Sequence, residues 1–244
     1  MKMTVVGSSS KGNAYLLTAS NGETLQLEAG CPVDDVYRAM NFNISGLVGV
    51  CITHEHLDHA RYVKQYLDRG RRVLALRDVF DGIENRSYCT LIESMHGYAV
   101  GRFKILPVRV HHDVPCVGFV IDHPEMGRHL FATDTMMLEY RFDGLNHIMI
   151  EANYADEILN ENVDAGIVPA ILRDRLMTTH MSIGNAINLL RANDLSAVNE
   201  IVLIHLSDNN SDADEFRERV IKATGKTVYI ASKGLEVEFN KEVY

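Results

Sequence analysis

The stretch Thr53-His54-Glu55-His56-Leu57-Asp58-His59-Ala60 contains four side chains that can bind metal ions within six residues. It follows the apolar run Leu47–Ile52, which predicts a buried strand. Apolar residues at helical spacing after it predict a helix that continues to about Leu67. The cluster therefore lies at the junction of a strand and a helix, where one short segment can present several side chains to the same region.

The spacing inside this cluster suits two ions. Residues i and i+2 of an extended segment project to the same side, so His54 and His56 can reach one ion. Asp58 and His59 lie where the chain turns into the helix, which directs them to a second, neighbouring point. Imidazole and carboxylate ligands without a thiolate suit Zn²⁺ or Mn²⁺, and iron less well. We therefore expect two divalent metal ions as cofactors.

Four side chains do not complete two metal sites, so further ligands are expected elsewhere. The doublet His111-His112 and the following Asp113 come after the predicted strand Phe103–Val110. Asp134 and His205 each follow another short apolar strand. Polar groups at the ends of apolar strands are where a site on a sheet edge is built, and we expect these residues to join the cluster.

The 244-residue chain has the composition of a globular protein, with 46% hydrophobic and 23% charged residues, which excludes global disorder. It contains no apolar run of about 18 residues, so no membrane span is predicted. The first residues lack the layout of a signal peptide, and the four cysteines form no CxxC pair. Isolated thiols in such a chain fit a reducing compartment, and we expect a cytoplasmic location.

The formal net charge of −9 argues against a broad surface that coats nucleic acid. The segment Arg61–Arg77 departs from this acidic balance, because it carries six basic residues and the single acid Asp68. It could guide a phosphate backbone towards the cluster, or it could be an ordinary exposed helix face and turn. The six basic residues are Arg61, Lys64, Arg69, Arg71, Arg72 and Arg77.

Short strands alternate with helices along the whole chain, with no repeat, low-complexity tract or linker between them. The economical interpretation is one domain over residues 1–244 of the α/β (α+β) class. The expected helices are Pro32–Met40, a segment around Asp164–Met177, Ser182–Asn193 with Ser182 as its cap, and Asp212–Thr224 ended by Gly225.

The order of these motifs resembles the metallo-β-lactamase superfamily, whose HxHxDH signature is matched by His54–His59. Within that superfamily the chain resembles the bacterial WalJ-type exonuclease group. It departs from that group's pattern at Glu28, where Asp is usual, and at Met136, where Gly is usual. The segments that carry the resemblance are Gly7–Asn13 (GSSSxGN), Leu27–Gly30 (IDAG), His112–Phe119 (HD…PVGF), Ala132–Thr135 (ATDTG), Thr179–Ser182 (GHLS) and His205–Asn210 (HLSxxNN).

The resemblance implies a four-layer αββα sandwich with a two-metal site on the edge of its sheets. Carried onto the matching positions, it implies that two sets of side chains each hold one metal ion and that Asp134 bridges the two ions. The first set is His54, His56 and His112, and the second is Asp58, His59 and His205. For the last position of the first set His111 is a rival, and we prefer His112 because the Asp that follows it fits the HD pattern.

A second parallel is with the tRNA 3′-processing endonucleases of the superfamily. These enzymes use a Glu after a strand and a His in a GHST-like loop to deliver a proton. Glu151 follows a predicted strand here, and His180 precedes Met181-Ser182. The resemblance therefore implies that His180 and Glu151 are catalytic. Asp58 and Asp134 are also expected to be catalytic, because they can orient the attacking hydroxide.

The expected reaction is hydrolysis of a phosphodiester by a hydroxide that two metal ions generate from water. The resemblance implies a nuclease acting on DNA, in its narrower form a 5′ to 3′ exonuclease, with nucleic acid as substrate. The alternative is a hydrolase of small esters, thioesters or lactones on the same dinuclear site. A flavodiiron-type redox module is disfavoured by His56, where such modules usually carry a carboxylate. The sequence leaves DNA versus RNA and exonuclease versus endonuclease action open.

Overall fold

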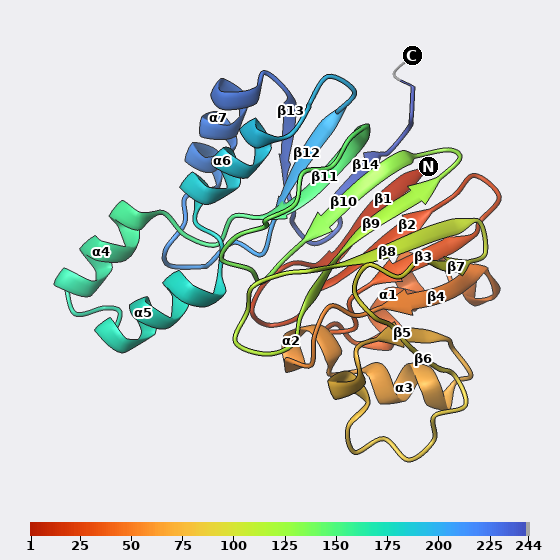
Figure 1. The fold of residues 1–244 in the computed structure, drawn as a ribbon. Coiled ribbons are helices and arrows are strands. Elements are labelled where there is room, and N and C mark those ends of the chain that lie inside the picture. The colour runs from red at the N-terminus through yellow and green to blue at the C-terminus, as the bar shows by residue number, and fades with distance from the viewer. Residues whose placement is uncertain (243–244) are drawn as a thin grey trace.

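Two seven-stranded sheets form the centre of the computed structural model, which describes residues 1–242 (Figure 1). In the first sheet the spatial order is β14-β1-β2-β3-β4-β5-β6. Strands β14 to β3 pair antiparallel, and β3 to β6 pair parallel. Its strands are β1 (Lys2–Gly7), β2 (Ala14–Thr18), β3 (Thr24–Leu27), β4 (Leu47–Cys51), β5 (Val73–Ala75), β6 (Cys89–Leu91) and β14 (Glu236–Glu238).

The second sheet has the order β13-β12-β11-β10-β9-β8-β7. Strands β13 to β10 are parallel, and β10 to β7 are antiparallel. Each sheet thus combines an antiparallel half with a parallel half, and the parallel strands end at a common edge. Its strands are β7 (Tyr98–Val100), β8 (Phe103–Arg109), β9 (Val117–His123), β10 (Gly127–Ala132), β11 (Leu145–Glu151), β12 (Glu200–Ile204) and β13 (Thr227–Ile230).

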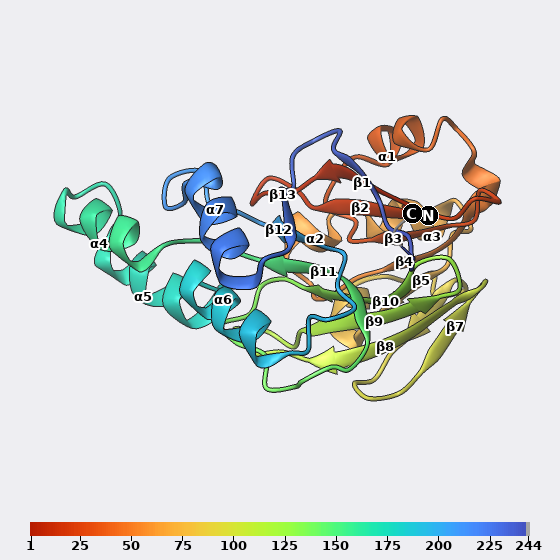
Figure 2. The same cartoon turned by 90° about the horizontal axis from the view of Figure 1, so that it is seen from above.

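Helices cover the outer face of each sheet, as Figure 2 shows. α1 and α3 pack on the first sheet, and α6 and α7 pack on the second. α4 and α5 extend away from the body of the molecule (Figure 1). The α-helices are α1 (Val33–Ala39), α2 (Leu57–Ala60), α3 (Val63–Asp68), α4 (Asp156–Asp164), α5 (Ala170–Thr179), α6 (Ile183–Ala192) and α7 (Ala213–Thr224), and the 3₁₀ turns are η1 (Ile44–Gly46) and η2 (Arg77–Phe80).

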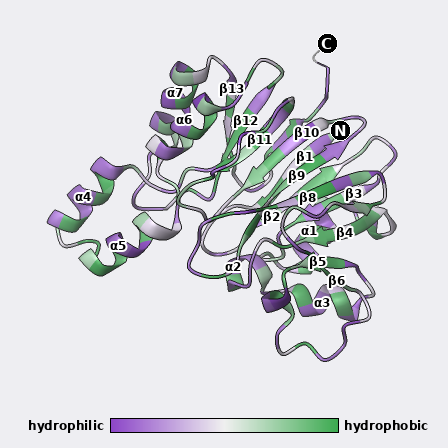
Figure 3. Ribbon diagram, viewed as in Figure 1, coloured by the Kyte–Doolittle hydropathy of each residue, from purple (hydrophilic) through white to green (hydrophobic). Residues whose placement is uncertain are grey.

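The main hydrophobic core lies between the two sheets. Leu17 and Leu25 from the first sheet meet Phe119 and Phe131 from the second, and all four are fully buried. Figure 3 shows the hydrophobic colouring along β4 and β9 that this packing requires. Separate apolar clusters join each sheet to its own helices. The layers therefore run helix, sheet, sheet, helix, which confirms the predicted αββα sandwich.

Two helix predictions need correction. The helix expected to run on to Leu67 is broken into α2 and α3. In a continuous helix the carbonyl groups of Asp58 and His59 would accept from residues 62 and 63. Instead they accept the N–H groups of Asn13 (2.8 Å) and Ala29 (2.7 Å), and the Tyr62 N–H donates to Ala29. Tertiary hydrogen bonds thus replace helical ones and hold the Thr53–Ala60 segment against the β1–β2 and β3–α1 loops.

The helix expected around Asp164–Met177 is in fact a turn followed by α5, and α4 before it was not predicted. α4 ends near Asp164, and Gly166 adopts a left-handed φ of 70°. Pro169 then caps the start of α5, which is a usual place for a residue without an N–H. By contrast, Ser182 caps α6 with its side chain, and Gly225 ends α7 at φ 67°, as predicted.

Within residues 1–242, no helix has both the length and the apolar character needed to cross a bilayer.

Gly30 offers a test of how tightly the Thr53–Ala60 segment is held. A Cβ at this position would lie 1.7 Å from the Asp58 carbonyl oxygen, so the backbone must move. We expect Gly30→Ala to lower the free energy of unfolding by about 3 kcal/mol, as overpacking against backbone does. A Cβ at Gly97 meets nothing within 4 Å, so Gly97→Ala is the matched control. Equal urea midpoints for the two variants would contradict this packing.

Candidate metal centre

The side chains named from sequence converge at one edge of the two sheets. His54 follows β4, His112 follows β8, Asp134 follows β10 and His205 follows β12. Four of the strands near this edge are parallel and end there, which is where open α/β sheets place their ligand sites. The structure thus brings together residues that lie up to 151 positions apart, from His54 to His205.

A first group consists of His54, His56, His112 and Asp134, whose ligand atoms all lie within 4.8 Å of one another. Nε2 of His112 is 3.2 Å from Nδ1 of His56. Nε2 of His54 is 3.4 Å from a carboxylate oxygen of Asp134. His54 and Asp134 are buried, whereas His56 is partly exposed, so this group opens to the surface on one side.

A second group consists of Asp58, His59, Asp134 and His205. Nε2 of His59 lies 3.2 Å from Asp58 and 3.0 Å from Asp134. Nε2 of His205 lies 3.3 Å from the same Asp58 oxygen. Asp134 belongs to both groups, which is the position that a bridging carboxylate requires.

These distances fit divalent cations. Two ligands on one tetrahedral zinc, each about 2.1 Å from the ion, are about 3.4 Å apart. The distances between neighbouring ligand atoms here are 3.0 to 3.4 Å. Among the described residues, Nε2 of His54 is buried without a hydrogen-bond partner. The donor sets are three imidazoles with a carboxylate, and two imidazoles with two carboxylates, which suit zinc or manganese.

The pKa values show that this edge needs positive charge. Burial raises the pKa of Asp134, but His205 and His59 outweigh it, and the pKa lies well below its ordinary value. Burial lowers the pKa of His59 and of His205, but Asp134 outweighs burial and raises both well above the ordinary value. Protons on these two imidazoles therefore compensate the carboxylates. A divalent cation can take their place, releasing protons as it binds.

His112, rather than its neighbour, lies in the cluster. The His111 side chain is 51% exposed, and its Nε2 pairs with Glu139 at 3.0 Å. The His112 side chain is only 1% exposed. Its Nδ1–H donates to the Thr179 carbonyl at 2.9 Å, which leaves Nε2 free to bind metal. The geometry therefore agrees with the preference for His112.

Two residues that orient the cluster were not assigned roles from sequence. Asn13 places its side-chain amide 3.4 Å from Asp58 and 3.2 Å from Nε2 of His59. Glu28 is fully buried, and its carboxylate lies 3.5 Å from Nδ1 of His59. These two atoms make no hydrogen bond at this distance, but the buried carboxylate favours positive charge on the ring or on an ion that the ring binds. Both residues lie in the quoted motifs Gly7–Asn13 and Leu27–Gly30, which is the signal that could have found them.

Three residues of this site adopt left-handed backbone conformations without being glycine. They are Glu28 (φ 65°), Asp134 (φ 47°) and His205 (φ 56°). Such conformations are uncommon for non-glycine residues and cost free energy, and they gather at functional sites. Here they turn a carboxylate or an imidazole towards the cluster directly after a strand.

The predicted pair Glu151 and His180 lies beside the second group. Nδ1 of His180 is 2.7 Å from Oε1 of Glu151, which is also 3.0 Å from Nδ1 of His205. The other Glu151 oxygen accepts the N–H groups of Thr135 and Met181. Glu151 is fully buried, so it is no surface carboxylate. Burial lowers the pKa of His180, but Glu151 outweighs it and the pKa is raised.

A cleft of about 460 Å³ lies in front of this edge. His56, Asp58, Asp134, His180 and His205 line it, so four of the candidate ligands and His180 face one space. Residues of α5 and of the turn before it also line the cleft. The basic segment Arg61–Arg77 does not line the cleft. Its basic residues are largely exposed, on α3 and in the turns that flank α3 and β5, and Lys64 pairs with Asp68 within α3.

No protein-family model and no curated protein sequence matches the chain. Solved structures do match. YhfI from Bacillus subtilis, a metallo-β-lactamase fold protein, aligns with a TM-score of 0.72 and 15% identity over 97% of this chain and 98% of its own. Zn²⁺-bound PqqB from Methylobacterium extorquens aligns with a TM-score of 0.71 and 13% identity over 98% and 100%. The short form of human tRNase Z aligns with a TM-score of 0.63 and 14% identity, over 98% of this chain and 99% of its own.

The chain has the metallo-β-lactamase fold. Identities of 13 to 15% over essentially whole chains show a shared architecture and nothing finer. In this fold the edge where the parallel strands end holds the His/Asp cluster described above. The narrower resemblance to the WalJ-type exonuclease group stays a prediction.

The doublet His111-His112 provides a matched test of the first ligand group. We expect His112→Ala to lose one bound ion per chain after loading with Zn²⁺ or Mn²⁺, because an imidazole that faces the ion is removed. His111→Ala, a change of the same size one residue away, should retain the metal content of the unaltered protein. Elemental analysis of desalted protein gives the ion count. The assignment is wrong if His111→Ala loses metal and His112→Ala does not.

Proposed function

We propose that this chain is a metal-dependent hydrolase of phosphodiester bonds, with DNA as its substrate and 5′ to 3′ exonuclease action as its narrowest form. The observation that carries the proposal is the pair of ligand groups that share Asp134 and open on the same cleft as His180. Seven side chains would hold two divalent cations, Zn²⁺ or Mn²⁺. They are His54, His56, Asp58, His59, His112, Asp134 and His205.

Two bound cations supply an activated water near neutral pH and neutralise charge that develops on a phosphate. The chain's own residues do the rest. Asp58 contacts both His59 and His205, so its carboxylate fixes the second group. Asp134 ties the two groups together and fixes their separation. Partners behind them hold several of these side chains in position. The Asn13 amide lies behind Asp58, and the Thr179 carbonyl accepts from His112.

His180 is the proton donor of the proposed reaction. Its Nδ1–H is engaged by Glu151, and its ring lines the cleft, so Nε2 is the atom that can pass a proton to the leaving oxygen. Glu151 orients the ring and raises the pKa of His180, which favours the protonated imidazole. An alkoxide leaving group from a sugar needs such a proton, which favours a phosphodiester over an activated thioester.

The comparisons give further support, since the matched structures include a human tRNase Z and a zinc-bound protein. The exposed basic segment Arg61–Arg77 adds positive charge next to α2, where a phosphate backbone could be drawn in. The competing proposal is a hydrolase of small esters, thioesters or lactones. The apolar side chains on the α5 side of the cleft, such as Leu172 and Leu176, are the feature that favours it.

A substrate panel tests the proposed function. Protein loaded with Mn²⁺ or Zn²⁺ should hydrolyse bis-p-nitrophenyl phosphate and a DNA fragment with defined 5′ and 3′ ends, and Asp134→Ala should abolish both activities. The fragment lengths over time distinguish exonuclease from endonuclease action, and an RNA fragment of the same sequence distinguishes the sugar. Turnover of a thioester or lactone without any phosphodiester cleavage would overturn the proposal in favour of its competitor.

The role of His180 predicts a pH dependence. Glu151 raises the pKa of His180 above 6.5. His180 is therefore protonated at lower pH, and it loses the proton that it would donate as the pH rises through this raised pKa. The kcat of the unaltered protein should therefore decline on the alkaline side. His180→Ala should lower kcat by roughly 10²–10⁴-fold and lack that decline. Its metal content should be unchanged, and loss of metal would instead make His180 a ligand or a structural residue.

A further inference from the structure

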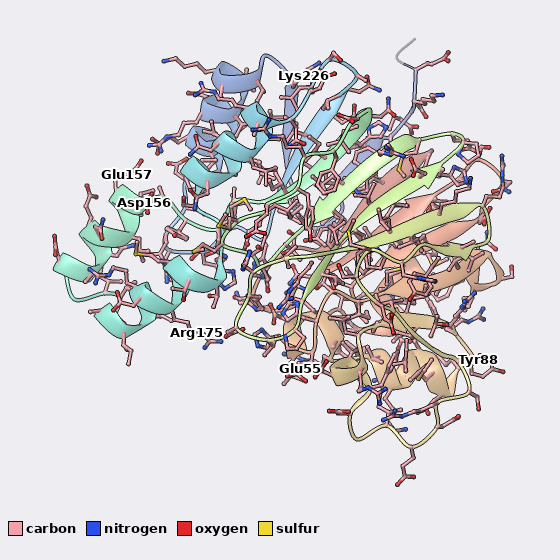
Figure 4. All side chains as sticks on the ribbon, in the orientation of Figure 1. Glu55, Tyr88, Asp156, Glu157, Arg175 and Lys226 are labelled. Atoms are coloured by element: carbon pink, nitrogen blue, oxygen red, sulfur yellow. The ribbon has the colours of Figure 1, made fainter. Side chains whose placement is uncertain are left out.

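The cleft in front of the metal centre has two chemically different walls. One wall is polar, with Asn153 and the loop after β12 beside the candidate ligands. The other comes from α5 and the turn before it, and it is apolar apart from one cation, Arg175. Figure 4 labels Arg175 on the half of α5 that joins the body of the molecule. The apolar residues of this wall are Ile167, Val168, Leu172 and Leu176.

Arg175 is the only lysine or arginine among the described residues that line the cleft. Three carboxylates also line it, but Asp58 and Asp134 belong to the ligand groups, and Asp208 lies 3.5 Å from Nζ of Lys11. Arg175 is therefore the residue of this lining that can meet negative charge extending beyond the reacting bond.

Arg175 is tied to the metal centre through one carboxylate. Its Nη2 lies 3.1 Å from Oδ2 of Asp113. The other oxygen of Asp113 lies 3.1 Å from Nε2 of His112 and 3.5 Å from Nε2 of His56. The guanidinium thus lies one side chain away from the first ligand group. This ion pair connects α5 to the loop after β8 and so positions the Arg175 guanidinium.

The ion pair is also easy to exchange. The Arg175 side chain is 62% exposed and that of Asp113 is 33% exposed, so solvent screens their attraction. Two oxygens of a phosphate can accept parallel hydrogen bonds from the same guanidinium, whereas only one oxygen of Asp113 faces it here. An incoming phosphate can therefore replace Asp113 as the partner of Arg175.

We propose that Arg175 selects anionic substrates by binding a phosphate that flanks the reacting bond, while the apolar wall of α5 contacts the attached base. This inference rests on the proposed function and deepens it, because it assigns the specificity of the cleft to α5. Arg175 binds the substrate and takes no part in bond cleavage.

The test compares two arginines of the same helix. Arg175→Ala should raise KM for a DNA tetranucleotide, which carries phosphates that flank the reacting bond, by about tenfold, the loss expected for a hydrogen bond to a charged group, with kcat close to that of the unaltered protein. KM for a neutral p-nitrophenyl ester should not change. Arg173→Ala is the control, because Arg173 pairs with the adjacent Asp174 and is absent from the cleft. It removes the same charge from α5 and should leave both KM values unchanged.

A binding measurement separates this inference from the proposed function. Calorimetry with a phosphorothioate-linked tetranucleotide reports binding to the metal-loaded protein without turnover. If the unaltered protein binds it and Arg175→Ala binds about tenfold more weakly, the inference holds even where no phosphodiester is hydrolysed. If phosphodiesters are hydrolysed but Arg175→Ala behaves like Arg173→Ala in both assays, the inference is wrong and the function stands. Equal losses with the anionic and the neutral substrate also overturn it.

Discussion

The site depends on one carboxylate, Asp134, which faces imidazoles from both ligand groups. It is nearly fully buried and lies within 3.4 Å of His54 and within 3.0 Å of His59 and His205. A buried carboxylate is tolerated only when positive charge surrounds it. His59 and His205, whose pKa values are raised, meet that need from two separate segments. The charge of Asp134 is thus compensated where the segments after β4, β10 and β12 meet.

The backbone around the cluster is held as tightly as its side chains. The carbonyl groups of Asp58 and His59 accept N–H groups from Asn13 and Ala29 instead of continuing a helix. Gly30 lets these loops approach within contact distance of Asp58. Local helical preference is thus overridden by tertiary hydrogen bonds at the one place where ligand geometry must be exact. This is a common way for a fold to give up local stability at a functional site.

The sequence predicted what depends on local spacing. The HxHxDH cluster, the ligands after strand ends and the αββα layers follow from periodicity, motif order and resemblance, and the capping of α6 by Ser182 follows from side-chain chemistry. It did not predict what depends on distant partners. The break before Tyr62 requires the Ala29 carbonyl, and the role of Asp113 requires Arg175, 62 residues away. Gly166 and Pro169 are residue types that predict a turn, but the apolar residues on both sides of them suggested a single helix.

Charge compensation also explains how the candidate metal centre and the proposed proton donor can share one cleft. In the ligand groups, protons on His59 and His205 balance the carboxylates, so a cation that binds there competes with those protons. His180 is balanced by Glu151, which lies at the end of β11 behind both His180 and His205. A cation held by the ligand groups can displace protons from His59 and His205 while Glu151 still favours the proton on His180. The same buried acid therefore contacts both a candidate ligand and the proposed donor.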